Sequence, residues 1–165
     1  MEYALLVGTA YKTFLNKAHP WLQLICRLFL GVMFITSGIE KVTHWTPFYQ
    51  AAAAYKVLPE DLLYFYAQVL PWAEIMAGAY LVLGLFTRYA AGAVAAMILS
   101  FLIAITIVLI RGDEIDCGCF VGGKSEPVTW KKWVEDVGLL LMAGYLIWVK
   151  PIAWSIDGFL RGDKN

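Results

Sequence analysis

Charged side chains are scarce in this sequence. Only 16% of the 165 residues are charged, whereas 61% are hydrophobic. A soluble domain needs a more polar surface than this composition supplies, so a water-soluble globular protein is excluded. The 13 basic residues are balanced by 13 acidic ones. Because the chain has no excess of positive charge, we expect no nucleic-acid partner.

Metal-binding side chains are also few, with three cysteines and two histidines. A closed zinc site takes four ligands, most often Cys and His. The candidates near one another in the expected topology are Cys117 and Cys119, with His44 and Asp116 as further choices. His44, next to Trp45, is better explained as a membrane-interface residue. The sequence therefore predicts no closed zinc site.

Long apolar stretches make up most of the remaining sequence. A membrane-spanning helix needs about 20 apolar residues, because its backbone polar groups must pair within the segment. Four stretches fit, at residues 21–39, 60–86, 89–110 and 130–149. The first is too long for a signal peptide and has no small-residue cleavage site after it, so we expect it to be retained. We predict an all-α four-transmembrane-helix bundle, with residues 1–165 as a single membrane domain.

Two local patterns add detail to this bundle. Between the first two stretches, Thr46 as N-cap and Pro47 as first helical residue predict a short helix, and neighbouring aromatic side chains such as Tyr49 favour the membrane interface. In the third stretch, Gly92 and Ala96 are small residues one turn apart. That spacing predicts close packing against another helix.

The expected topology places both termini on one side and the loops after spans one and three on the other. Basic residues, which set orientation, divide equally between the two sides. We expect the termini in the cytoplasm and the cysteine loop, residues 111–129, outside. The protein is then a multi-pass protein of the cytoplasmic (inner) membrane of a prokaryote.

Two of the three cysteines flank a single glycine, as Cys117-Gly118-Cys119. A disulfide joins Cα atoms about 4.4–6.8 Å apart, which two such residues reach when the residue between them bends freely. The resulting ring is strained, and strained disulfides exchange readily whereas structural ones resist reduction. The pattern therefore predicts a disulfide that is formed and broken repeatedly.

The reactivity of these thiols depends on nearby charges. The thiolate is the attacking form and cations favour it. The candidate cations are Lys124, Arg111 and Lys41, which lies at the same end of the first span, and we assign this role to Lys41. Asp116 disfavours ionisation of Cys117 as a like charge, and it can transfer protons during exchange. The same thiols could instead bind a soft metal ion, and an ordinary loop with two neighbouring cysteines is a third interpretation.

Polar groups inside the apolar stretches form a second set of candidates. Arg27 and Glu74 each cost at least about 2.5 kcal/mol at the centre of a helix unless they are paired or hydrated, so we expect them to pair with each other. Such a pair is either a buried site for protons or a quinone head group, or a structural ion pair. Asp136 is expected among polar groups nearer the cysteine loop. Cys26, about 20 Å in depth from that loop, is expected to be a buried, inert thiol.

The chain also carries residue patterns of a known family. The stretch "CRLFLGVMFITSGIEK" resembles R-x-x-x-G-x-x-F followed by S/A-G-x-x-K, and "LPWAEIMAGAYLVLGLFTR" resembles P-x-x-E-x-x-x-G…G; both are patterns of DoxX-like membrane proteins. "DCGCFVGGKSEPVTWKKWVEDVGLLLMA" is similar to the MauE-like, methylamine-utilisation branch of that superfamily. The residues that carry the first two patterns are Arg27, Gly31, Phe34, Gly38, Lys41, Pro71, Glu74, Gly78 and Gly84.

The resemblance covers residues 21–149 and implies a membrane protein linked to disulfide formation or thiol redox in exported proteins. One DoxX relative is linked to quinone-dependent sulfur oxidation, which makes a quinone a candidate cofactor. Two residues depart from the pattern. Val121 intrudes between Phe120 and the glycines, which changes the loop, and Glu135 replaces the basic residue often found before the aspartate, which removes a cation partner for Asp136.

The first functional hypothesis is an enzyme, an integral membrane thiol-disulfide oxidoreductase. Cys117 and Cys119 exchange disulfides or electrons with an extracytoplasmic partner, either a thioredoxin-like protein or an exported thiol protein. The alternative is a protein that binds or transports a soft metal of the mercury or copper type, or a metalloid. A non-catalytic membrane scaffold is the third hypothesis. Membrane lipid surrounds the helices, and the sequence leaves the electron partner and the oligomeric state open, a homo-oligomer included.

Overall fold

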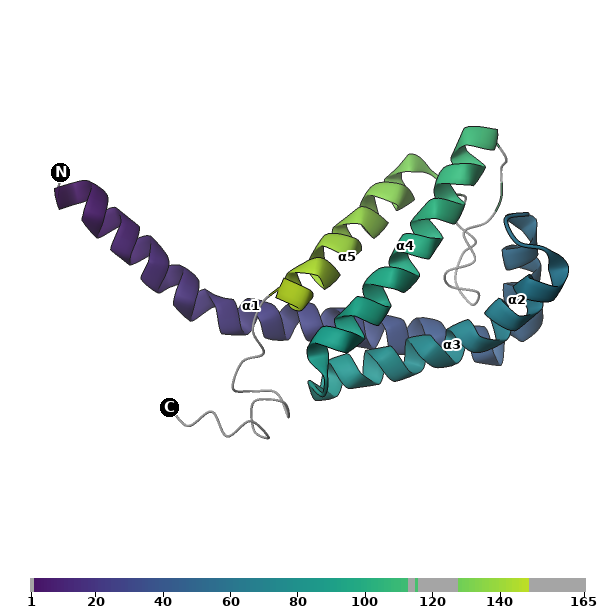
Figure 1. Ribbon diagram of the computed structural model, residues 1–165, viewed down its shortest axis with the longest axis horizontal. Helices are drawn as coiled ribbons and strands as arrows, with labels where there is room; N and C mark the ends of the chain where they lie inside the picture. The colour runs from purple at the N-terminus through teal and green to yellow at the C-terminus, as the bar shows by residue number, and fades with distance from the viewer. Residues whose placement is uncertain (1, 113–114, 116–127, 149–165) are drawn as a thin grey trace.

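The computed structural model describes residues 2–112, 115 and 128–148, with side chains from Trp21 onwards. Within that part of the chain there are five α-helices and no strand, so the all-α prediction is confirmed there (Figure 1). The helices are α1 (Glu2–Thr43), α2 (Trp45–Ala54), α3 (Glu60–Leu83), α4 (Thr87–Arg111) and α5 (Trp130–Trp148).

The helix boundaries differ from the predicted ones mainly at two places. α1 begins at Glu2 and continues through Pro20, whereas the sequence predicted a start at residue 21. A proline removes one hydrogen bond, and the preceding Ala, Leu and Lys residues favour a helix on their own. α3 ends at Leu83 and not at residue 86, because Gly84 caps it in the left-handed region with a φ of 68°.

Two of these helices meet the length and hydropathy expected of a membrane span in the described part of the chain. They are Trp21–Thr43, within α1, and Thr87–Arg111, which is α4. α3 and α5 are helices at the predicted positions, but their role as spans stays a prediction. The five helices therefore agree with the predicted bundle in number and order, with the short α2 between the first two long ones.

α2 forms where the short helix was predicted, but its start is different. Its N-cap is His44, which makes no side-chain capping bond, so the prediction of Thr46 as N-cap is wrong. The reason is that α1 and α2 are nearly continuous. The His44 N–H donates to the Glu40 carbonyl at 2.9 Å, and the Phe48 N–H donates to the His44 carbonyl at 3.2 Å. The helix axis therefore turns at His44 itself, before Thr46 is reached.

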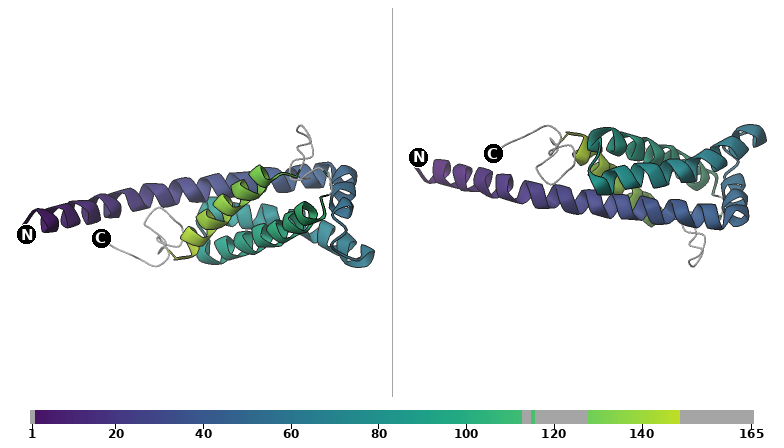
Figure 2. Two further views of the ribbon diagram at one scale, coloured as in Figure 1. Left: turned by 90° about the horizontal axis from the view of Figure 1, so that it is seen from above. Right: turned by 90° about the horizontal axis from the view of Figure 1, so that it is seen from below.

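The long helices pack mainly as two pairs, α1 with α3 and α4 with α5, and α3 also contacts α4 (Figure 2). α1 and α3 approach so closely that side chains do not fit between them at two levels. A Cβ atom added at Gly78 would lie 2.7 Å from the Gly31 carbonyl oxygen, and one at Gly38 would lie 2.7 Å from the Pro71 carbonyl oxygen. Glycine therefore sets the distance between these two backbones.

Gly92 and Ala96 on α4 do not make the close contact that the sequence predicted. A Cβ atom added at Gly92 would meet nothing within 4 Å, and Ala96 is exposed. The prediction of a close helix contact at this pair is wrong within the chain. The small residues that matter are on α1 and α3, because those two helices lie side by side over the greatest length.

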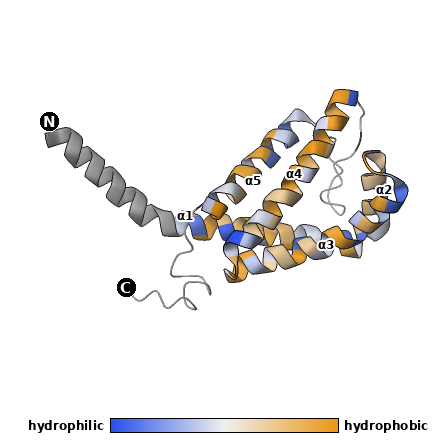
Figure 3. Cartoon of the chain, viewed as in Figure 1, coloured by the Kyte–Doolittle hydropathy of each residue, from blue (hydrophilic) through white to orange (hydrophobic). Residues whose placement is uncertain are grey.

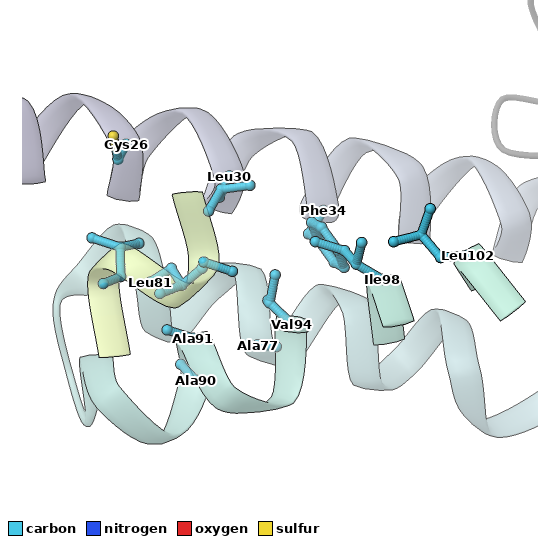
Figure 4. Close-up of a cluster of buried hydrophobic side chains, with 12 residues drawn as sticks. Cys26, Leu30, Phe34, Ala77, Leu81, Ala90, Ala91, Val94, Ile98 and Leu102 are labelled. Carbon is cyan, nitrogen blue, oxygen red and sulfur yellow. The ribbon is translucent and has the colours of Figure 1, made fainter. Parts of the chain in front are cut away.

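The core lies between α1, α3, α4 and α5 as a row of apolar side chains. Figure 4 shows it running from Cys26 and Leu81 at one end, through Leu30 and Val94, to Leu102 at the other. Cys26 is 7% exposed, so its predicted burial is confirmed. A second, smaller cluster joins the end of α2 to the end of α4 and the start of α5. It consists of Tyr55, Ile105, Val108 and Val128.

The outward faces of the helices are apolar as well. Figure 3 shows hydrophobic colour along most of α4, with hydrophilic residues at its two ends. Large apolar side chains point away from the core on every long helix. A soluble protein buries such side chains, whereas lipid accepts them. Examples are Ile25, Phe29, Val69, Met76, Leu99, Ile103, Val134 and Leu141.

Candidate functional site

The predicted redox residues Cys117, Cys119 and Asp116 lie outside the described residues. The chain on both sides of them is described. The Val128 N–H donates to the Ile115 carbonyl at 2.9 Å, which joins the two ends of segment 116–127. This segment therefore starts and finishes at one point of the molecule.

That point is next to the end of α2. Arg111, the last residue of α4, donates from Nη1 to the Tyr55 carbonyl oxygen at 3.3 Å. Tyr55 also packs against Phe101 of α4, with ring centroids 6.1 Å apart, and shares an apolar cluster with Val128. The connections that follow α1 and α4 are therefore at the same end of the bundle, as the predicted topology requires.

A buried ion pair links α1 to α3 near this end. The Lys41 Nζ lies 2.5 Å from the Glu74 Oε1, and the two side chains are 8% and 7% exposed. Lys41 also donates to the Ser37 Oγ at 3.0 Å, and the Ser37 hydroxyl donates to the Glu74 Oε2 at 3.5 Å. Both carboxylate oxygens therefore have partners, which offsets the cost of burying the charge.

The aromatic ring of Phe48 closes this site from α2. The Lys41 Nζ lies 5.5 Å from the ring centroid, within the range of a cation–π interaction. Phe48 is itself buried. The short helix that follows α1 therefore covers the ion pair and separates it from water.

The local sequence explains why these groups meet. Ser37 and Lys41 are one helical turn apart, so they lie on the same face of α1. Gly38 lies on that face too, and a Cβ atom there would lie 3.2 Å from the Glu74 Cβ. The absent side chain lets α3 come close enough for Glu74 to reach both Ser37 and Lys41. The S-G-x-x-K and P-x-x-E patterns are thus two sides of one contact.

The predicted pairing of Arg27 with Glu74 is wrong. Glu74 has Lys41 as its ion-pair partner. Arg27 lies one turn before Gly31, which faces Gly78, and Gly78 lies one turn after Glu74. Arg27 and Glu74 are therefore about two turns, or roughly 12 Å, apart in depth. Arg27 is buried elsewhere on α1, and a quinone site that involves Arg27 and Glu74 stays a prediction.

Lys41 lies at the predicted end of the first span, but its ammonium group is committed to Glu74 and Ser37. Its assignment as the cation that favours a Cys117 or Cys119 thiolate stays a prediction, because both cysteines lie outside the described part of the chain. To serve in this way Lys41 would have to act while it remains paired.

Asp136 is the second buried carboxylate, at 4% exposure, two turns into α5. Its Oδ1 lies 3.4 Å from the Lys132 Nζ on the same helix. Nearby, the Trp133 Nε1–H donates to the Thr106 Oγ1 at 3.1 Å and links α5 to α4. Asp136 is therefore among polar groups in the half of α5 that is nearer the cysteine segment, as expected.

Three residues of these sites were not singled out from the sequence. Ser37 stands four residues before Lys41, and Lys132 stands four residues before Asp136, a spacing that indicates a shared helix face. Phe48 carried no such signal, because its contact with Lys41 depends on the turn between α1 and α2.

His44 is exposed, and its ring Nδ1 lies 3.0 Å from the Thr43 Oγ1. Among the described residues, no group of three His, Cys, Asp or Glu side chains forms a metal site.

An all-α structure with apolar outward faces defines an integral membrane protein as its class. The family model described as "Methylamine utilisation protein MauE" matches residues 19–149. That match covers most of the chain, which therefore belongs to the MauE family. No solved structure matches the chain.

Individual relatives agree with this assignment. The methylamine utilization protein MauE of Methylorubrum extorquens is 34% identical over 143 residues, which are 86% of this chain and 77% of the relative. The protein of the same name from Paracoccus denitrificans is 34% identical over 125 residues, or 75% of this chain and 67% of the relative. An uncharacterized membrane protein of Mycobacterium tuberculosis is 29% identical over 136 residues, or 82% and 79%.

Proposed function

We propose that this chain is a four-span thiol-disulfide redox protein of a prokaryotic cytoplasmic membrane, and that it serves methylamine utilisation as an accessory protein. The observation that carries the proposal is the closure of segment 116–127 beside Tyr55, through the Ile115–Val128 and Arg111–Tyr55 hydrogen bonds. Ile115 and Val128, the described residues on either side of the Cys-Gly-Cys pair, meet at an end of the long helices, where a partner in water would reach a dithiol. The relatives named for methylamine utilisation support the accessory role.

Aromatic side chains at both ends of the bundle support four spans. Tyr64, at the start of α3, and Trp130, at the start of α5, are exposed at one end. Tyr89, near the start of α4, and Trp148, at the end of α5, are exposed at the other. Trp and Tyr gather at the two interfaces of a bilayer, and the 19 residues of α5 extend about 28 Å, close to the thickness of the hydrocarbon. α3 and α5 then cross the membrane beside α1 and α4.

In the proposed reaction a thiolate of Cys117 or Cys119 attacks the disulfide of a partner. A mixed disulfide forms and one partner thiolate leaves. The second cysteine then attacks the mixed disulfide, so that the pair becomes oxidised and the partner is released as a dithiol; the reverse sequence oxidises the partner. The partner is a thioredoxin-like or exported thiol protein. Asp116 carries protons in these steps. A quinone is the candidate oxidant that takes two electrons and two protons from the reduced pair and becomes a quinol, and in the reverse direction a quinol reduces the disulfide.

Trapping of the mixed disulfide tests this proposal. Cys119→Ala or Cys117→Ala removes the resolving thiol, so one of the two variants should accumulate a covalent adduct with a thioredoxin-like or exported thiol protein. The adduct should disappear on reduction. Cys26→Ala is the matched control, because Cys26 is buried in the core and should not form or affect the adduct.

Metal binding by the same thiols gives a different result. If neither variant forms an adduct, and the unmodified protein binds one mercuric or cuprous ion tightly with loss of thiol reactivity, the soft-metal alternative replaces the redox proposal. Unchanged behaviour of the double variant in both measurements would leave the scaffold hypothesis.

A further inference from the structure

Asp136 has one carboxylate oxygen without a partner among the described residues. The side chain is 6% exposed, and its Oδ1 lies 3.4 Å from the Lys132 Nζ. Its Oδ2 is fully buried and makes no hydrogen bond. An ionised oxygen in this position would lack both water and a donor, which is among the costliest arrangements in an apolar interior.

The polar groups nearest this level of the neighbouring helix α4 are already occupied. Thr106 accepts a hydrogen bond from the Trp133 indole at 3.1 Å and donates one to the Leu102 carbonyl at 2.7 Å. Arg111, at the end of α4, donates to the Tyr55 carbonyl. α4 therefore supplies no donor for the Asp136 Oδ2.

The charged groups of α1 are engaged or distant. Lys41 is paired with Glu74 of α3. Arg27 follows Cys26, which belongs to the core cluster against which Tyr145 packs, and Tyr145 is nine residues, or about 13 Å, along α5 from Asp136. Among the described residues, the charged groups close to Asp136 are Lys132 and Glu135, both on α5.

A proton is the cation that this geometry suits. Sodium, calcium and magnesium ions require several oxygen ligands at once, whereas one unpaired oxygen is enough for a proton. Within residues 21–112, 115 and 128–148 no group of three His, Cys, Asp or Glu side chains exists to complete a metal site. We infer that Asp136 is a proton-binding site, which exchanges protons with the end of the bundle where α5 begins.

Lys132 and Glu135 provide the route. The Lys132 Nζ lies 3.8 Å from the Glu135 Oε2 and 3.4 Å from the Asp136 Oδ1, and Glu135 is half exposed. A proton taken from water by Glu135 passes to Asp136, and no other bond changes. Lys132 stays charged throughout. It pairs with Glu135 when Asp136 is neutral, and it is shared between the two carboxylates when Asp136 is ionised.

Infrared difference spectroscopy tests this site without reference to the cysteines. The full chain is reconstituted in lipid nanodiscs and its spectra are recorded over a pH series. At neutral pH the unmodified protein should show a C=O stretching band of a protonated carboxylic acid that is missing in Asp136→Asn. Glu60→Gln is the matched control, because it removes an exposed carboxylate in the first turn of α3, outside this route, and should leave the band in place.

Two further variants separate a proton site from a structural role. In Lys132→Met the band should persist to higher pH, because the cation that favours the ionised form is gone. Asp136→Glu serves if Asp136→Asn does not fold, because it keeps a carboxylic acid at this position. In this variant the C=O stretching band should move in frequency. An identical band in unmodified protein and Asp136→Asn, or no response to Lys132→Met, overturns the inference.

The cysteine chemistry and the proton site can fail separately. The Cys117→Ser/Cys119→Ser variant should retain the Asp136 band. If the band is present and no mixed disulfide can be trapped, the proposed redox function is wrong and the proton site stands. If the adduct forms and the band is absent, the proton site is wrong and the redox function stands.

Discussion

The α1–α3 pair and the α4–α5 pair bury a carboxylate in different ways. In the first, glycines bring two backbones together, and Glu74 on one helix is neutralised by Lys41 on the other, with partners for both oxygens. In the second, a hydrogen bond from Trp133 to Thr106 links the helices, and within the described part of the chain the ion-pair partner of Asp136 is Lys132 of its own helix. The Lys41–Glu74 pair holds two helices in one register. The Lys132–Asp136 pair lies within one helix, so protonation of Asp136 would break no ion pair between helices.

The largest expected effect comes from breaking the pair between helices. Glu74→Ala or Lys41→Met leaves one buried charge without its partner, which costs about 3–5 kcal/mol in the free energy of unfolding. Denaturant unfolding of the purified protein in detergent, followed by tryptophan fluorescence, measures this loss. Unfolding at unchanged denaturant concentration in both variants would contradict a buried, coupled pair.

The double variant Lys41→Met/Glu74→Ala is the control for that experiment. It removes both charges and replaces them with apolar side chains, so it should be more stable than either single variant. Free energies that simply add would show that the two residues do not act on each other.

A smaller effect is expected from the backbone contact of the same pair. Gly78→Ala places a Cβ atom 2.7 Å from the Gly31 carbonyl oxygen, which belongs to a backbone and cannot rotate away. We expect a loss of about 1–3 kcal/mol, again from denaturant unfolding.

Gly92→Ala is the matched substitution on α4, where the new Cβ atom meets nothing within 4 Å. Alanine favours a helix over glycine by about 1 kcal/mol, so this variant should be unchanged or more stable. Equal destabilisation by Gly78→Ala and Gly92→Ala would mean that the close α1–α3 backbone contact is not the cause of the loss.

The smallest effect is expected at the α4–α5 contact. Trp133→Phe removes the indole donor to Thr106 and should cost about 0.5–1.5 kcal/mol, the net contribution of one hydrogen bond. Thr106→Val should cost a similar amount, and the double variant should cost less than the sum, as a double-mutant cycle in detergent would reveal. Lys131→Ala, in the exposed pair with Glu135, serves as the reference with a loss of about 0–1 kcal/mol.

Much of the helix pattern could be predicted, since length and hydropathy act locally. The predicted start at residue 60 and the predicted helices at 89–110 and 130–149 agree with α3, α4 and α5 to within three residues. The contacts between helices could not be predicted as well. The sequence led us to expect Arg27 as the partner of Glu74, whereas the structure has Lys41, because sequence gives the depth of a residue along its helix but not the register between two helices.

The sequence by itself determined that this chain forms long apolar helices, that charges inside them require compensation, and that Cys117 and Cys119 are one glycine apart. These properties follow from composition and from the fixed geometry of a helix. Only the tertiary structure decided that Gly38 faces Pro71, which brings Glu74 to Lys41, and that the Asp136 Oδ2 has no donor among the described residues. Rotation and sliding of one helix against another depend on the fit of many side chains at once, and no local pattern encodes that fit.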